Sequence, residues 1–228
     1  MDPGVVLNRG RDSCRAGRYR EALEDYIWFH EHALEHDRSY YGVRLSFALL
    51  DWRDLAEVYR PAMKALASVR ARAAAALRTG AGDRALFHDL ASIDRALGKV
   101  RDTHALFRLL WRRQPGLAMQ CRDLAVEAVV EAGDFELASR CLPHPETYVL
   151  WLSDRLNEAL EAKALPRRAA AVRREAYVRN YCTDVETGIR ILRGLENHAA
   201  ARAFREWAIA LVGSRGARNQ VLERLAPR

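Results

Sequence analysis

The three residues whose types and spacing best suit a chemical reaction are His32, Glu35 and His36, in the stretch His32-Ala-Leu-Glu35-His36. Two histidines four residues apart share one face of a helix, so both imidazoles can bind one zinc ion. The glutamate can then act as the general base that activates a water. A catalytic zinc site also needs a third ligand, typically a glutamate from a later helix. These residues make a zinc-dependent hydrolase one alternative function.

This spacing resembles the H-x-x-E-H pattern of inverzincin metalloproteases. The apolar neighbours Trp28, Phe29 and Leu34 place the segment at the end of a helix, where charged side chains commonly form a solvated face. The chain has no P-loop, no GxGxxG and no GxSxG. We therefore predict no catalytic residue, no bound metal and no cofactor, and we interpret the chain as a protein other than an enzyme.

The helices that would carry such residues follow a pattern that is clearest in residues 86–142, which read as two helical hairpins in tandem. Gly98 and Gly133 lie 35 residues apart. Each is followed by an apolar residue two positions on and a small residue five positions on, namely Val100 and Thr103, then Phe135 and Ala138. Glycine tolerates the positive φ that a tight turn between helices requires. The small residue lets the two helix axes approach, and Pro115 breaks the chain before the second hairpin.

A period near 34 residues with this order of residue types resembles the tetratricopeptide repeat. Gly17, Tyr19 and Ala22 give a third match near the start of the chain. The resemblance implies an all-α, right-handed α-solenoid of antiparallel helix hairpins. It also implies a protein–protein interaction module that serves as an adaptor, a regulator or a neutralising partner.

Apolar positions at helical spacing extend the helical prediction over the rest of the chain, and no alternating strand pattern interrupts it. We expect separate helices over residues 167–181 and 183–194, the second one begun by a capping box, Thr183-Asp-Val-Glu186. We divide the chain into N-terminal hairpins with a degenerate long-helix pair, the tandem repeats, and basic C-terminal hairpins, all in one continuous superhelix. Their ranges are 1–82, 83–142 and 143–228.

The resemblance also implies a binding face, because the first helix of each hairpin in such repeats lines the concave groove. The residues that this places in the groove are Asn8, Arg11, Arg15, His88, Asp89, Ser92, Arg95, Asp123, Glu127 and Glu131. Repeats that clamp a peptide's terminal carboxylate use an asparagine and basic residues there. Asn8 fits that pattern, but Asp89 and Leu124 occupy the equivalent tandem positions. A mixed-charge groove favours an internal peptide or a folded protein as the partner.

The net charge of +7 lies entirely in the last third of the chain. Residues 1–163 carry 24 basic and 24 acidic side chains, whereas residues 164–228 carry 13 basic and 6 acidic ones. A basic patch is concentrated in one predicted helix and consists of Arg167, Arg168, Arg173, Arg174 and Arg179. Arginines at this density can neutralise phosphates, which makes a nucleic-acid-binding protein the second alternative, or they can steer an acidic protein partner. We find no interleaved aromatic pattern for base stacking.

Composition gives the expected compartment. No run of about 18 apolar residues predicts a membrane span, and the first residues lack the basic and apolar stretches of a signal peptide. The four cysteines form no CxxC pair, so we interpret them as buried free thiols. We expect a cytoplasmic protein without a membrane partner. Because 34 of the 37 basic residues are arginines, a GC-rich bacterial genome is a second explanation for the basic balance.

Overall fold

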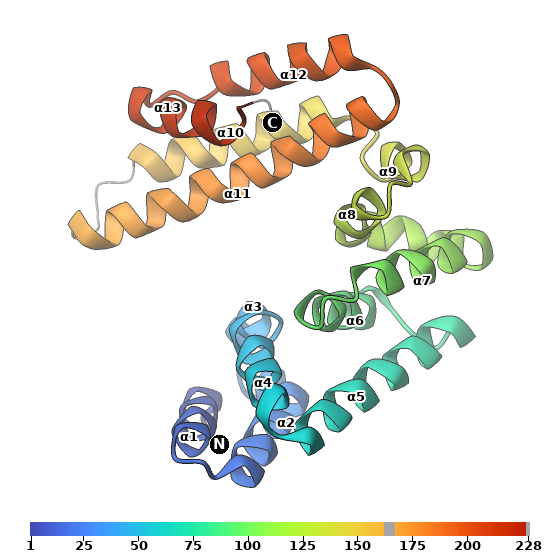
Figure 1. Ribbon diagram of the computed structural model, residues 1–228, viewed down its shortest axis with the longest axis vertical. Helices are drawn as coiled ribbons and strands as arrows, with labels where there is room; N and C mark the ends of the chain where they lie inside the picture. The colour runs from blue at the N-terminus through green and yellow to red at the C-terminus, as the bar shows by residue number, and fades with distance from the viewer. Residues whose placement is uncertain (162–166, 227–228) are drawn as a thin grey trace. The chain divides into compact units, whose positions relative to one another are not determined.

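The computed structural model describes residues 1–161 and 167–226, and the side chains of residues 167–170 lie outside this description. Within these ranges the chain forms helices and no strand, which confirms the all-α prediction (Figure 1). A 3-10 helix covers Arg38–Tyr40. The α-helices are α1 Pro3–Arg15, α2 Tyr19–His36, α3 Tyr41–Arg44, α4 Phe47–Val58, α5 Arg60–Thr79, α6 Arg84–Ala96, α7 Val100–Arg113, α8 Pro115–Glu131, α9 Phe135–Cys141, α10 Pro145–Glu161, α11 Arg167–Gly194, α12 His198–Ala210 and α13 Arg215–Arg224.

The chain divides into two compact units, Met1–Ala128 and Val129–Arg228. The division falls within the last turn of α8. The first unit holds α1 to α7 and most of α8, and the second holds the end of α8 with α9 to α13. Each unit has its own hydrophobic core.

Three helical hairpins turn at the glycines that the sequence indicated. Gly17, Gly98 and Gly133 have φ values of 74°, 67° and 76°, in the left-handed region that glycine enters without steric cost. In each turn the N–H of the following residue donates to the carbonyl five residues back, at 2.7–3.1 Å. These bonds satisfy the last carbonyls of the first helix while the chain reverses direction.

A fourth turn of the same kind lacks the glycine. Glu196, between α11 and α12, has a φ of 60°. The N–H of Asn197 donates to the Leu192 carbonyl at 2.9 Å, as the equivalent N–H does in the other three turns. The sequence predicted that a helix ends at residue 194, and the structure confirms this boundary. It did not indicate the left-handed residue at 196, because the glycine that marks the other three turns is replaced by glutamate.

A small buried residue follows each of the four turns by five positions. These residues are Ala22, Thr103, Ala138 and Ala201, all at most 2% exposed. They lie in the second helix of each hairpin, and their burial shows that each position is closely packed. The predicted spacing of glycine and small residue is therefore confirmed at the three glycine turns.

The structure joins two helices that the sequence predicted to be separate. Residues 167–181 and 183–194 belong to one continuous helix, α11. Thr183 does not cap a new helix, since its hydroxyl donates to the Arg179 carbonyl one turn back at 3.1 Å. Propensity could not distinguish these outcomes, because threonine is accepted in a helix when its hydroxyl bonds to the backbone.

The core of the first unit contains a buried ionic network as well as apolar side chains. Asp94 of α6 is 0% exposed and accepts a hydrogen bond from the Thr103 hydroxyl at 2.8 Å. Its carboxylate also pairs with Arg70 of α5, which reaches Asp102 of α7 at 2.9 Å. The hydrogen bond with Asp94 raises the pKa of Arg70 above its ordinary value. Three helices are thus joined by one carboxylate.

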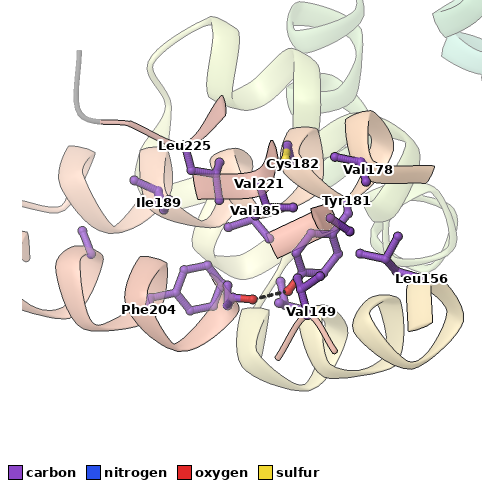
Figure 2. Packing of buried hydrophobic residues seen from close by; sticks show 14 residues of the cluster. Val149, Leu156, Val178, Tyr181, Cys182, Val185, Ile189, Phe204, Val221 and Leu225 are labelled. Atoms are coloured by element: carbon purple, nitrogen blue, oxygen red, sulfur yellow. Dashed lines mark hydrogen bonds between the residues drawn. The ribbon is translucent and has the colours of Figure 1, made fainter. Parts of the chain in front are cut away.

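The core of the second unit forms between α10, α11, α12 and α13. Figure 2 shows apolar side chains from all four helices directed toward one another, among them Val149, Val185, Phe204 and Val221. The Tyr181 hydroxyl donates to the Ala208 carbonyl at 2.7 Å, so its polar end is satisfied inside this core. Gly188 allows α12 to come close, since a Cβ there would lie 2.7 Å from the Phe204 ring.

We predict that Glu196→Gly stabilises the second unit by about 1 kcal/mol, because a non-glycine residue in the left-handed region carries strain of roughly 1–2 kcal/mol. Thermal unfolding measures the change. The matched control is Gly98→Ala, which introduces the same strain in the first unit and should destabilise it by a similar amount. A lower melting temperature for Glu196→Gly would contradict the assignment of this turn.

We predict that Asp94→Ala costs about 3–5 kcal/mol, because it leaves the buried Thr103 hydroxyl without its partner and leaves the partly buried Arg70 with only the exposed Asp102. Thr103→Val removes a single hydrogen bond at almost constant volume and should cost about 1 kcal/mol. Urea unfolding of the two variants gives the comparison. Equal and small losses would mean that the network contributes little to the fold.

Candidate functional site

Two ion pairs connect α6 with α8 on the face that the sequence analysis predicted to bind a partner. Arg84 donates to both carboxylate oxygens of Asp123, at 2.6 and 2.8 Å. Arg95 Nε lies 3.1 Å from Glu127 Oε2. The four side chains are 44–62% exposed. Solvent therefore weakens both pairs, and their charges stay within reach of another molecule.

The electrostatics of the first pair follow from its two hydrogen bonds. The bonds from Arg84 lower the pKa of Asp123 below its ordinary value, and the same bonds raise the pKa of Arg84. Arg84 also donates to the Gln120 carbonyl, so its guanidinium is fixed against α8. This pair holds α6 against α8 in addition to presenting charge.

The surface beneath the second pair is closed. A crevice of about 10 Å³ lies between Arg95, Thr103 and Glu127, with apolar neighbours from all three helices. This volume accommodates about one water molecule. The α6–α8 face thus offers charged groups on a packed surface at this point, with no room for a small-molecule substrate.

Glu131, at the end of α8, belongs to the second unit and pairs with Arg190 of α11. Arg190 Nη1 lies 2.5 Å from Glu131 Oε1, and the two side chains are 40% and 49% exposed. Arg190 also donates to the Val130 carbonyl at 3.4 Å. This predicted binding residue therefore joins two helices of its own unit.

His88 and Asp89 contact α3, and both have intramolecular partners. The Tyr41 hydroxyl lies 2.8 Å from His88 Nδ1, and burial lowers the pKa of His88. Asp89 pairs with Arg44, a buried arginine that also donates to the His30 carbonyl at 3.2 Å. The carboxylate of Asp89 therefore balances the positive charge of the buried Arg44 guanidinium.

The remaining predicted residues lie in different surroundings. Ser92 is 3% exposed, and its hydroxyl has no hydrogen-bond partner in the part of the chain that the structure describes. Its side chain therefore does not belong to the exposed face, because α6 turns this position inward. On α1, Arg11 bonds to Asp51 of α4 at 2.8 Å and to Asn8 at 3.3 Å. Arg15 is exposed and pairs with Asp12 at 2.7 Å.

The predicted basic patch lies along α11. Arg174 and Arg179 are exposed, and the Arg173 guanidinium lies 5.6 Å from the centre of the Tyr177 ring. Arg167 and Arg168 begin the helix, but their side chains lie outside the described residues. All five positions belong to one long helix, α11.

Sequence reasoning missed an aromatic group on the neighbouring helix. Tyr148 and Trp151 of α10 stack with ring centres 6.1 Å apart and an angle of 21° between the rings. Arg155 covers Trp151, with its guanidinium carbon 5.0 Å from the ring centre. Tyr148, Trp151 and Arg155 lie three and four residues apart, and this spacing could have indicated that they share one side of a helix. However, Leu150 and Leu152 lie on either side of Trp151 in the sequence, so the exposure of its ring was not evident from residue types alone.

The histidine motif adopts an ordinary helical arrangement. His32 Nδ1 lies 3.1 Å from Glu35 Oε2, and the rings of His32 and His36 lie 5.7 and 5.4 Å from the Trp28 ring. No group of three histidine, cysteine, aspartate or glutamate side chains that could hold a metal ion lies in the described ranges. The third ligand that a zinc hydrolase requires is therefore not among these residues.

Comparisons of the chain with protein-family models, with curated proteins and with solved structures gave no match in any of the three. Among the described residues, no helix has the length and apolar character needed to cross a membrane.

The buried His30 gives a pH prediction. Burial, assisted by Arg44, lowers its pKa from 6.5 to about 4. Between about pH 4 and pH 6.5, the imidazole of His30 is therefore mostly protonated in the unfolded chain and mostly neutral in the folded chain. Stability should rise with pH across that window, by at most about 1.4 kcal/mol per unit, and this contribution should be flat above it. Urea unfolding of wild type and His30→Leu from pH 4 to 8 gives two curves of unfolding free energy against pH. The difference between the curves measures the contribution of His30. Parallel curves for the two proteins would contradict it.

Proposed function

We propose that the chain is a tetratricopeptide-like helical repeat protein that binds a protein or peptide partner across the exposed face of α6 and α8. It would act in the cytoplasm as an adaptor, a regulator or a neutralising partner. The repeated turn supports the repeat interpretation. Four hairpins share the same backbone hydrogen bonds and the same small buried residue, and two of them lie 35 residues apart.

The exposed charges on α6 and α8 carry the proposed binding role. Arg84, Asp123, Arg95 and Glu127 present both signs of charge on a rigid pair of helices, above a crevice too small for a metabolite. Charges arranged in this way match a partner with the opposite pattern, and they contribute specificity and association rate more than raw affinity.

Existing intramolecular pairing does not prevent such recognition. Exposed ion pairs of this kind contribute about 0–1 kcal/mol to stability. A charged group of a partner can therefore take the place of one member of the pair, and the free energy lost by breaking the internal pair is small. Arg95 and Glu127 are suited to this exchange, because each side chain is about half exposed.

We predict that Arg95→Glu and Glu127→Arg each weaken capture of the natural partner while changing unfolding free energy by at most about 0.5 kcal/mol. Immobilised protein incubated with a lysate of the source cells, followed by mass spectrometry, measures recovery. The combined exchange Arg95→Glu with Glu127→Arg restores an internal pair of reversed polarity. It should recover stability without recovering the partner.

The matched control is Arg20→Glu, which breaks an exposed ion pair with Glu24 on the second helix of the first hairpin. This variant should capture the partner as wild type does. If the α6–α8 variants recover the same proteins as wild type at equal yield, the face does not bind the partner.

A further inference from the structure

Outside the α6–α8 face, α10 presents an exposed stack of planar groups. Trp151 is 51% exposed and Tyr148 is 38% exposed. Their rings lie nearly parallel, with Arg155 over Trp151 as the third member. We refer to Tyr148, Trp151 and Arg155 as the α10 stack.

The core of the second unit does not account for this stack. Val149, Ser153 and Leu156 form the buried side of α10, each about 1% exposed. Figure 2 shows Val149 and Leu156 on that side, directed toward Tyr181. The exposed rings project from another part of the helix surface. The two rings leave a large apolar area in contact with water. A smaller polar residue at either position would expose less apolar area.

The neighbouring helix adds a second aromatic–guanidinium pair and most of the positive charge. α10 packs directly against α11 (Figure 1). On α11, Arg173 lies over Tyr177, and Arg174 and Arg179 are exposed. Since Asp154 and Glu158 on α10 are exposed and acidic, an anionic ligand would place its charge along α11 and its apolar groups on the α10 stack.

We propose that the α10 stack and the α11 arginines together bind single-stranded nucleic acid, with bases stacked on α10 and phosphates held by α11. Single strands expose both parts of the ligand, whereas a duplex buries its base faces. Aromatic stacking combined with arginine contacts is the physical basis of sequence-tolerant single-strand binding. An acidic peptide would use the arginines but would leave the rings without a function. This inference is independent of the proposed protein-binding face, which lies in the first unit.

The test uses the full chain and a fluorescently labelled 12-nucleotide poly-dT, with binding followed by anisotropy across a salt series. We expect the observed affinity to fall linearly with salt on logarithmic scales, because the phosphates release counterions. Trp151→Ala should weaken binding about 5- to 150-fold, the range for loss of one base–aromatic stack. Trp151→Phe should retain most of it, since the ring remains.

Two controls separate stacking from charge. Phe47→Ala removes an exposed aromatic ring of the first unit and should leave binding unchanged. An abasic strand of equal length should bind at least about five-fold more weakly to wild type, and it should bind wild type and Trp151→Ala equally. Circular dichroism and thermal unfolding establish that each variant is folded.

The arginines are tested by Arg173→Ala, Arg174→Ala and Arg179→Ala in combination, which should reduce the salt dependence of binding. Replacing Arg20, Arg78 and Arg101 of the first unit by alanine changes net charge equally and should have a much smaller effect. The proposal is overturned if Trp151→Ala binds poly-dT as wild type does. It is also overturned if the abasic strand or a polyglutamate peptide binds as tightly as poly-dT, since recognition would then depend on charge alone.

Discussion

A left-handed residue at the end of the first helix is the constraint that four of the hairpins share. With φ near 60–76° at Gly17, Gly98, Gly133 and Glu196, the chain can reverse direction while it still satisfies the last carbonyls of the helix it leaves. The second helix then starts close to the first. That proximity requires a small side chain five residues on, and all four positions meet the requirement. One backbone dihedral angle and one side-chain volume therefore determine how closely the paired helices pack.

Polar contacts between helices then fix the neighbours of each hairpin. Asp94 joins α5, α6 and α7 from a fully buried position, and Asp89 joins α3 to α6 through the buried Arg44. Buried charges of this kind are costly to separate from their partners. The exposed pairs, such as Arg95 with Glu127, are weak by comparison and remain open to exchange with a partner.

The two proposed binding surfaces differ in the kind of ligand that their chemistry fits. The α6–α8 face combines both signs of charge on a closed surface, which favours a protein with the complementary pattern. The α10–α11 surface combines exposed rings with arginines, which favours stacked bases and phosphates. Each surface lies within one unit, so each can be tested with variants that leave the other unit intact.

The sequence by itself determined the helical class, the three glycine turns and the small residues that follow them. These features are local, since helical periodicity, glycine's freedom at positive φ and the spacing of five residues are all carried by neighbouring positions. It also named most of the charged residues on α6 and α8. The tertiary structure decided what those charges contact. Asp89 compensates Arg44, Ser92 turns inward, and Trp151 lies outside the core although leucines surround it in sequence. The left-handed conformation of Glu196 and the continuity of α11 across Thr183 were likewise not evident from the sequence. Contacts between distant segments set these outcomes, because the free energy of burying or pairing a side chain exceeds the local preference of its residue type.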